Sequence, residues 1–290
     1  MKTIAVAGGT GGVGSTIVDG LVEYGKHKVY VLSRTERPSH GGVNYLKVDY
    51  NDTDAIAEAF EKVGVNIVIC AISVLSPATN QAQKNLIRAA ERSTSTERFV
   101  ISSFDVLQVK EDIELSPLAR YVFEAIDELE KTKLAYTRIA NGWFLDYYGM
   151  PVWKSHLEPW INILNMKSKW AVIPGDGSIQ CSFITSQDMS KFVARLMDLP
   201  KWNTVSAITG NTLSYNELVE MAEKARVYVT KQNSCYYWRA PSGCMDRSIA
   251  RREPRCCRNL YISFKLRLSP KPQFLRQVAV LGQLIPLCLR

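Results

Sequence analysis

The chain has 290 residues, of which 46% are hydrophobic, 22% charged and 10% aromatic. This composition excludes a wholly disordered chain, a collagen and a coiled coil, and it allows one large domain or two small ones. No run of about 18 uncharged apolar residues occurs, so we expect no membrane-spanning helix and no membrane partner. The first residues lack the pattern of a secretory signal, and we expect a cytoplasmic protein.

Charge and cysteine content divide the chain near residue 226. Residues 1–226 hold 24 Lys and Arg against 26 Asp and Glu, a net charge of −2, whereas residues 227–290 hold 12 against 2, a net charge of +10. Five of the seven cysteines lie in this last part. We interpret residues 227–290 as an atypical basic tail that is either disordered or a shifted or unspliced reading of the gene. A nucleic-acid partner is the alternative, and we do not expect one.

Apolar strands alternate with amphipathic helices along residues 1–141. In chain order, the pattern predicts a strand over 3–7, a helix over 13–22, strands over 29–32 and 43–48, a helix over 54–63, a strand over 65–72, a helix over 78–92, a strand over 99–101, a helix over 118–131 and a strand over 134–139. Several of these strands are apolar on both faces, which indicates a parallel sheet covered by helices on both sides. We predict an α/β fold with a doubly wound parallel sheet, whose ligand crevice lies at the carboxyl ends of the strands.

Residues 142–226 have a mixed pattern. An aromatic-rich stretch over 143–160 leads to a turn, which is followed by a strand over 181–184 and by helices over 186–199 and 214–226. We predict three parts: a ligand-binding domain over 1–141, a small substrate lobe on the same sheet over 142–226, and the tail.

A glycine-rich turn joins the first strand to the first helix. It comprises Gly8, Gly9, Thr10, Gly11, Gly12, Val13 and Gly14. Glycines allow a tight turn and a close approach to a pyrophosphate, and the helix N-terminus supplies N–H donors and the positive end of a dipole. We predict a dinucleotide site here; the alternative is a glycine turn that binds no ligand.

The ends of the next three strands face the same crevice. Arg34 ends the second strand, where an acidic residue would favour NAD; a guanidinium there pairs with a 2′-phosphate and favours NADP(H). The alternatives are a solvated surface arginine and ordinary loops. We also assign Ser33, Thr35 and Arg37 to the phosphate. Asp49 and Tyr50 are assigned to the adenine, and Ala71, Ile72 and Ser73 to the nicotinamide ribose.

An ordered series of motifs resembles the NmrA-like family of atypical short-chain dehydrogenases, which is related to isoflavone reductases. The motifs are residues 8–14, Arg34, and residues 101–104, 135–139, 141–144 and 183–188. The resemblance covers about residues 1–226. It implies a Rossmann domain that binds NADP(H), and it implies that the loop formed by Asn141, Gly142, Trp143 and Phe144 closes over the nicotinamide.

The resemblance implies one of two functions. One branch reduces small aromatic or polyketide-like molecules, and its fungal members look like tailoring enzymes of secondary metabolism. The other branch binds the dinucleotide as a redox sensor, does no chemistry and docks on a protein partner. We predict an NADPH-dependent oxidoreductase that acts on a small molecule, and we keep the sensor as the alternative.

The proton donor is the open question of the sequence. The reductases carry an acid–base lysine that, by spacing, would fall in residues 118–124, and this window holds none. Arg120 lies in the window but does not release a proton near neutral pH, so the candidate relays are the hydroxyls of Ser103 and Tyr121. The histidines and cysteines show no metal-ligand spacing, and we predict no metal site.

Overall fold

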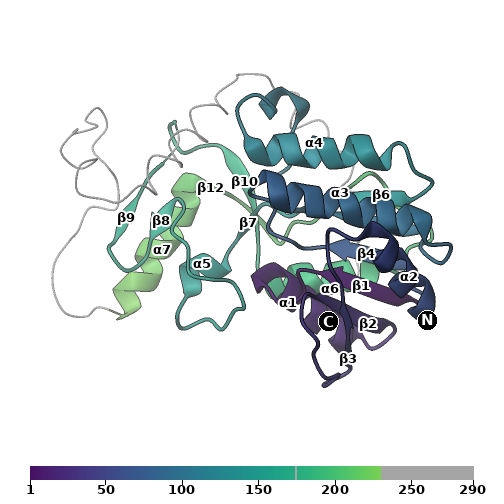
Figure 1. Ribbon diagram of the computed structural model, residues 1–290. Helices are drawn as coiled ribbons and strands as arrows, with labels where there is room; N and C mark the ends of the chain where they lie inside the picture. Colours follow the sequence, from purple (N-terminus) through teal and green to yellow (C-terminus); the bar gives the residue numbers. More distant parts are fainter. Residues whose placement is uncertain (174, 230–290) are drawn as a thin grey trace. The chain divides into compact units, whose positions relative to one another are not determined.

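In the computed structural model, which describes residues 1–173 and 175–229 without the side chains of 226–229, seven strands form the main sheet (Figure 1). In sheet order they are β3 (Val43–Lys47), β2 (Lys28–Ser33), β1 (Thr3–Ala7), β4 (Ile67–Cys70), β5 (Arg98–Asp105), β6 (Ala135–Ala140) and β11 (Val205–Ala207). Every neighbouring pair is parallel. The strand order reverses between β1 and β4, which creates a crevice at their carboxyl ends. The predicted doubly wound α/β fold is therefore confirmed.

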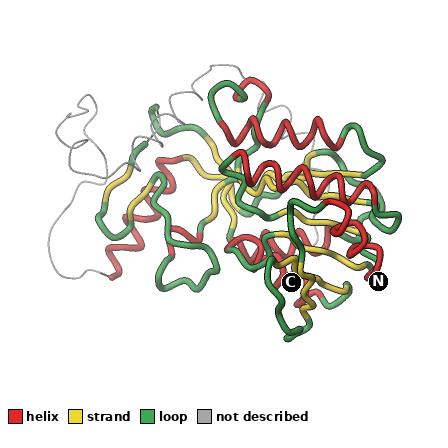
Figure 2. Tube along the Cα trace, in the orientation of Figure 1, coloured by secondary structure: helices red, strands yellow, loops and turns green. Residues whose placement is uncertain are grey.

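Helices cover both faces of this sheet (Figures 1 and 2). They are α1 (Gly12–Tyr24) and α6 (Ser186–Leu196) on one face, and α2 (Thr53–Val63), α3 (Pro77–Arg92) and α4 (Pro117–Leu129) on the other. Alternate residues of β1 point to opposite faces. Ile4 and Val6 pack against α1 and α6, whereas Ala5 and Ala7 pack against the other layer. This explains why the strand is apolar from Ile4 to Ala7.

The helix starts differ in one respect that concerns the crevice. Asp52, Ser76, Ser116 and Thr185 precede α2, α3, α4 and α6, and each accepts a hydrogen bond from a backbone N–H of the first turn. Gly11 precedes α1 and offers no such oxygen. The first N–H groups of α1 are therefore left without a side-chain acceptor.

Two strands differ from their predicted bounds by more than one residue. The strand predicted over 65–72 covers only Ile67–Cys70. The strand predicted over 99–101 continues to Asp105. The polar residues of this extension do not fit an apolar strand pattern, so the sequence did not predict it. In the structure the Ser102 hydroxyl donates to the Ile72 carbonyl oxygen at 2.6 Å, which satisfies a polar side chain inside the sheet layer.

Two helices end earlier than predicted. The helix predicted over 118–131 ends at Leu129, whose carbonyl oxygen accepts a hydrogen bond from the Thr132 hydroxyl at 2.7 Å. The helix predicted over 186–199 ends at Leu196, whose carbonyl oxygen accepts from the Trp202 indole at 2.9 Å. Side chains beyond the helix thus take over the free carbonyl groups of the last turn.

The remaining elements are short, except for the 15-residue helix α7. They are η1 (Lys110–Asp112), β7 (Trp143–Phe144), α5 (Asp146–Gly149), β8 (Leu164–Asn165), β9 (Trp170–Ala171), β10 (Gln180–Ile184), β12 (Asn211–Ser214) and α7 (Tyr215–Val229). β7, β10 and β12 form a second sheet, and β8 pairs with β9. The division of the chain at residues 141 and 226 stays a prediction, and the predicted tail lies outside the described residues from residue 230 on.

Candidate functional site

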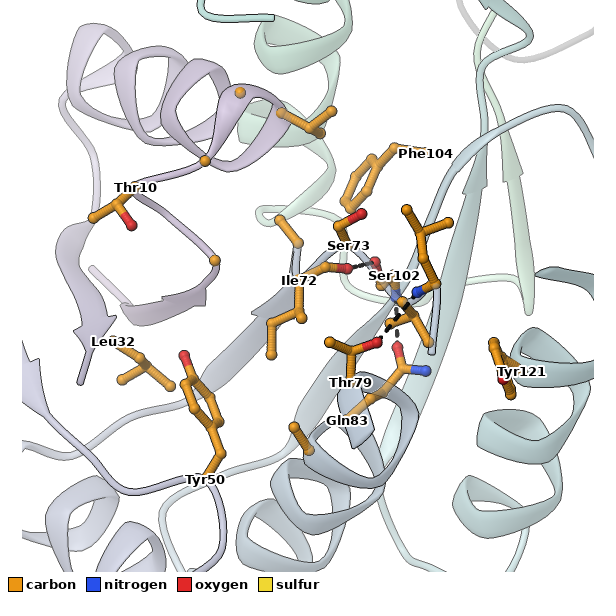
Figure 3. A pocket seen from close by; sticks show the side chains of 18 of the residues that line it. Thr10, Leu32, Tyr50, Ile72, Ser73, Thr79, Gln83, Ser102, Phe104 and Tyr121 are labelled. Carbon is orange, nitrogen blue, oxygen red and sulfur yellow. Dashed lines mark hydrogen bonds between the residues drawn. The ribbon is translucent and has the colours of Figure 1, made fainter. Parts of the chain in front are cut away.

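A cavity of about 1150 Å³ lies at the carboxyl edge of the main sheet (Figure 3). Pockets for one small ligand occupy roughly 300–1000 Å³, so this one has room for a dinucleotide together with part of a second molecule. The predicted cofactor residues that line it are Gly8, Thr10, Gly11, Gly12, Val13, Ser33, Arg34, Thr35, Arg37, Asp49, Tyr50, Ala71, Ile72 and Ser73.

The glycine turn brings two stretches of backbone into close contact. Gly8 has a φ of +75°, and a Cβ atom on it would lie 2.5 Å from the Ala71 carbonyl oxygen. A Cβ atom on Gly14 would overlap the Gly8 carbonyl oxygen. Gly9 and Gly14 do not line the cavity, and Gly9 packs on Val31 instead. These glycines therefore set the path of the backbone, and at its glycines the turn presents main-chain atoms to the cavity.

One end of the cavity is formed by the loop after β2, which carries Arg34. Arg34 is exposed at its rim, and in the described part of the chain its guanidinium makes no ion pair or hydrogen bond. The nearby Glu36 lies 3.9 Å from the Lys47 ammonium group. The Thr35 backbone N–H donates to the Ser33 hydroxyl at 3.3 Å, which bends the loop. The end of β2 thus offers a positive charge that has no carboxylate partner among the described residues.

Tyr50 lies between this end and the glycine turn. Burial raises the pKa of its phenol to about 12, although a hydrogen bond with the Gly8 backbone acts in the opposite direction. The phenol is therefore neutral, and its ring faces the cavity (Figure 3). The Asp49 carboxylate accepts the backbone N–H of Asn51 at 2.9 Å and its side-chain amide at 3.1 Å. The Tyr50 ring can pack on the face of an adenine, and the Asp49 carboxylate can accept a hydrogen bond from its edge.

In the middle of the cavity, α3 and β5 are linked by a hydrogen bond. The Gln83 side-chain oxygen accepts the Ser102 backbone N–H at 3.0 Å, and the Ser102 hydroxyl binds Ile72 (Figure 3). Thr79 accepts the Leu75 backbone N–H at 3.2 Å. These bonds fix the loop after β4. Sequence reasoning missed the α3 residues, although small residues four positions apart (Ala78 and Ala82) mark the helix face that lines the cavity.

The far end of the cavity is mainly aromatic. Phe104, Tyr121, Tyr147 and Trp160 line it, and the rings of Tyr147 and Trp160 meet edge to face with centroids 5.4 Å apart. Ser103 also lines it, is 5% exposed, and donates its hydroxyl to the Asp105 carboxylate at 3.4 Å. Two hydroxyls that are candidates for proton transfer therefore lie in this wall.

Arg120 is not part of the wall. It lies on the exposed side of α4, whereas Leu118, Tyr121 and Val122 line the cavity. Successive residues of a helix are rotated by about 100° around its axis. Tyr121 therefore points towards the cavity, whereas Arg120, one residue earlier, points away from it.

The four residues of the predicted nicotinamide loop lie behind the lining of the cavity. The backbone N–H groups of Asn141 and Gly142 donate to the Asp105 carbonyl oxygen at 3.0 and 3.1 Å, and Phe144 belongs to the core. Trp143 stacks on Trp160, which does line the cavity, with centroids 6.2 Å apart. The loop thus supports the aromatic wall, and a direct contact with a nicotinamide stays a prediction.

The sequence places the residues that follow α5 in the substrate lobe but singles out none of them as a site residue. Leu157, Glu158, Pro159 and Trp160 line the cavity, although no helical or strand pattern marks them. Among the described residues, no three His, Cys, Asp or Glu side chains are grouped so as to hold a metal ion. In the same residues, no helix has both the length and the apolar character that crossing a bilayer requires.

Solved structures share this fold. Leucoanthocyanidin reductase from Vitis vinifera, in its binary complex with NADPH, matches 82% of this chain and 77% of its own, with a TM-score of 0.62 and 18% identity. AtPrR2 with NADP⁺ and (+)pinoresinol matches 82% of this chain and 78% of its own, with a TM-score of 0.64 and 20% identity. At such identities the likeness establishes the fold alone.

Sequence comparison narrows the assignment. The oxidoreductase BOA1 of Botryotinia fuckeliana is 37% identical over 227 residues, which cover 77% of this chain and 76% of the relative. The oxidoreductase swnN of Metarhizium robertsii is 29% identical over 255 residues, covering 77% and 73%. The model of the NmrA-like family matches residues 1–236. The chain therefore belongs to the NmrA-like family.

Proposed function

We propose that this protein is an NADPH-dependent oxidoreductase that reduces a small molecule. The observation that carries the proposal is the composition of one cavity, which has at one end a glycine turn and an arginine without a partner among the described residues, and at the other end aromatic rings with the two candidate hydroxyls. The names of the relatives support the class of reaction, and the NADPH and NADP⁺ complexes among the structural neighbours support the cofactor.

The residues present fit such a dinucleotide. Because the start of α1 has no side-chain cap and a Cβ atom on Gly11 would meet no described protein atom closer than 3.4 Å, its N–H groups can bind a pyrophosphate. We assign Arg34 to the 2′-phosphate and Tyr50 to the adenine. When bound, NADPH supplies a hydride, and the protein's part is to orient it and to manage the proton.

Reduction of a carbonyl or a conjugated double bond also requires a proton. We assign its delivery to the hydroxyl of Tyr121, a residue that lines the aromatic end of the cavity. The Ser103 hydroxyl is the second candidate, but its proton is already engaged by the Asp105 carboxylate. Either hydroxyl would relay a proton from water, since the window in α4 offers no lysine.

We infer that the substrate is an aromatic or polyketide-type molecule and that the reaction is a tailoring step of secondary metabolism. The wall of Phe104, Tyr147 and Trp160 favours a flat apolar ligand. Pinoresinol reductase 2 of Arabidopsis thaliana, a relative at 24% identity, is named for an aromatic substrate.

The missing lysine supports a second candidate function. A chain that binds NADP(H) but lacks an acid–base group could report the redox state of the cofactor to a protein partner without turning over a substrate. This sensor would use the same glycine turn and the same Arg34, so cofactor binding alone does not separate the two candidates.

A turnover assay tests the proposal. The full chain is incubated with NADPH and a panel of small enones, ketones and aromatic ethers, and the loss of NADPH is followed. Consumption that depends on one class of compound is the expected result. Absence of turnover, together with unequal affinities for NADPH and NADP⁺, would favour the sensor, and absence of binding by either nucleotide would contradict both functions.

A further inference from the structure

A buried carboxylate holds one wall of the cavity without lining it. Asp146 is the first residue of α5 and is 1% exposed. One of its oxygens accepts the hydroxyls of Ser155 at 2.7 Å and Ser186 at 2.5 Å, and the other accepts the Ser186 backbone N–H at 2.8 Å. Ser186 is the first residue of α6, so the helix dipole also favours the negative charge. The buried charge is therefore well compensated.

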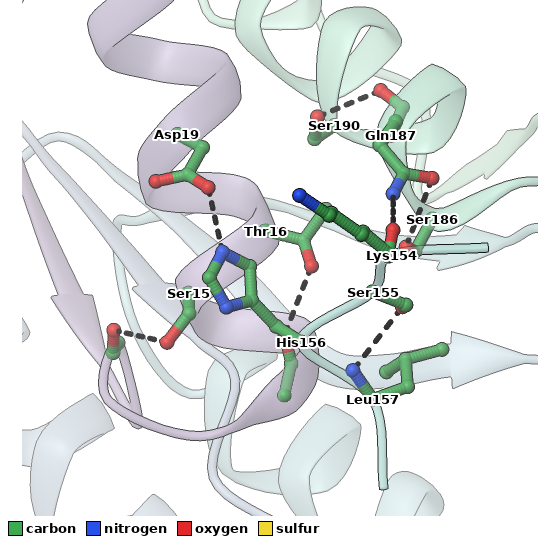
Figure 4. Close-up of polar contacts among 12 residues, drawn as sticks. Ser15, Thr16, Asp19, Lys154, Ser155, His156, Leu157, Ser186, Gln187 and Ser190 are labelled. Carbon is green, nitrogen blue, oxygen red and sulfur yellow. Dashed lines mark hydrogen bonds and ion pairs between the residues drawn. The ribbon is translucent and has the colours of Figure 1, made fainter. Parts of the chain in front are cut away.

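Ser155 connects this carboxylate to the cavity. Its oxygen also accepts the Leu157 backbone N–H at 3.2 Å (Figure 4). Leu157 is 7% exposed and lines the cavity. A Cβ atom on Gly12 would lie 3.1 Å from the Leu157 Cα and 2.9 Å from the His156 carbonyl oxygen. The hydrogen-bonded series that begins at Asp146 thus ends against the glycine turn.

Ser155 and Leu157 belong to residues 152–160, which we call the strap. The strap has three more polar attachments, two of them visible in Figure 4. The Gln187 side-chain amide donates to the Lys154 carbonyl oxygen at 2.9 Å, and His156 lies 2.7 Å from the Asp19 carboxylate. In the third, the Trp153 indole N–H donates to the Gln187 side-chain oxygen at 3.3 Å. All three involve exposed groups, and exposed pairs contribute little. The attachment of Ser155 to the buried Asp146 is therefore the one to test first.

We propose that Asp146 and Ser155 are positioning residues that seat the strap on the glycine turn and so set the affinity for the cofactor. The strap contacts Gly12 at the pyrophosphate end and carries Trp160 into the aromatic wall, so one attachment serves both ends of the cavity. This inference rests on the proposed function, because the ligand concerned is NADPH.

Ser155→Ala isolates the proposed link. It removes the hydroxyl that joins Asp146 to Leu157 and leaves both hydrogen bonds between Asp146 and Ser186 in place. If the seated fraction of the strap falls to about one tenth, the apparent Kd for NADPH rises about tenfold. We expect that rise, together with faster amide hydrogen exchange in residues 154–160, at a nearly unchanged melting temperature. Asp146→Asn should reproduce both effects and also lower the melting temperature, because it weakens the hold on Ser186.

Ser178→Ala is the matched control. It removes another serine-to-aspartate hydrogen bond, of 2.6 Å to Asp176, in an exposed turn that does not line the cavity. It should change neither NADPH binding nor exchange in the strap.

Exchange is measured without ligand as well, so this test does not depend on the cofactor assignment. Wild-type exchange rates in the strap of Ser155→Ala would overturn the inference, as would a wild-type Kd in that variant. A wild-type protein that binds no NADPH would contradict the proposed function and the claim about affinity, and the exchange rates would still show whether Ser155 holds the strap.

Discussion

The two ends of the cavity are built in different ways. The cofactor end is formed by loops that directly follow β1, β2, β3 and β4, and each loop lies within a few residues of its strand. The aromatic end is assembled from three separate stretches of the chain, namely β5, α4, and α5 with the strap that follows it. The first end depends on local backbone geometry, whereas the second depends on how distant segments pack. Substitutions should therefore affect the two ends differently.

The largest loss of NADPH affinity is expected from a substitution in the glycine turn, where the path of the backbone forms the site. Gly14→Ala would place a methyl group on the Gly8 carbonyl oxygen, so the turn must move. A displacement of about 1 Å can cost about a hundredfold, and we expect at least that loss in NADPH affinity, with a lower melting temperature. Fluorescence titration with NADPH and thermal unfolding measure the two effects.

Gly64→Ala is the control for this change. Gly64 also has a positive φ, of +68°, but a Cβ atom there would meet nothing within 4 Å. The substitution should lower stability modestly and leave NADPH affinity unchanged. If Gly14→Ala bound NADPH as the wild type does, the turn would not be the pyrophosphate site.

The same contrast explains which parts were predictable from sequence. Hydrophobic period, glycine spacing and strand ends are local signals, so the main strands, their helices and the loops carrying Arg34 and Tyr50 could be placed. Leu157 and Trp160 reach the cavity through the Ser155–Asp146 link and through ring packing, and no local pattern encodes either. The strands of two residues, such as β7, are too short to show alternation.

At the aromatic end, Tyr121→Phe tests the proton assignment. The change keeps the ring that lines the cavity and removes only the hydroxyl. General acid catalysis contributes about a hundredfold or more, so kcat should fall by about that factor while the Kd for NADPH stays the same. Steady-state kinetics with the first substrate found in the panel provide the measurement.

Ser103→Ala is the companion variant. It should lower kcat less, because the Ser103 proton already engages Asp105. The reverse order of the two effects would move the relay to Ser103. Equal, full activity in both variants would remove side-chain hydroxyls from the mechanism and leave the proton to water.

At the cofactor end, Arg34→Ala tests the choice of nucleotide. A charge-assisted hydrogen bond to phosphate contributes about 1.5–3 kcal/mol, so NADPH binding should weaken about tenfold to a hundredfold, with little change for NADH. Arg120→Ala removes an arginine that does not line the cavity and should affect neither nucleotide. Equal weakening of NADPH and NADH in Arg34→Ala would show that the guanidinium does not recognise the 2′-phosphate.

The smallest effect is expected outside the cavity, just before the start of β2. The His27 side chain is 1% exposed, and its Nε2 lies 3.4 Å from the Asp198 carboxylate. Neither ring nitrogen makes a hydrogen bond to a described residue. Burial lowers the pKa of His27 below its ordinary 6.5, while Asp198 raises it and Lys2 and Lys26 lower it. The folded protein therefore favours the neutral ring.

This shift fixes the sign of a pH effect on stability. Well above pH 6.5 the ring is neutral in both states, so His27 contributes no pH dependence there. As the pH falls through 6.5, the unfolded chain takes up a proton that the folded ring resists, and stability decreases until the pH passes the lower, folded pKa. His27→Phe keeps a ring of similar size and should flatten this part of a urea-unfolding series. An unchanged slope would assign the dependence to other groups, and a slope of opposite sign would mean that Asp198 outweighs burial.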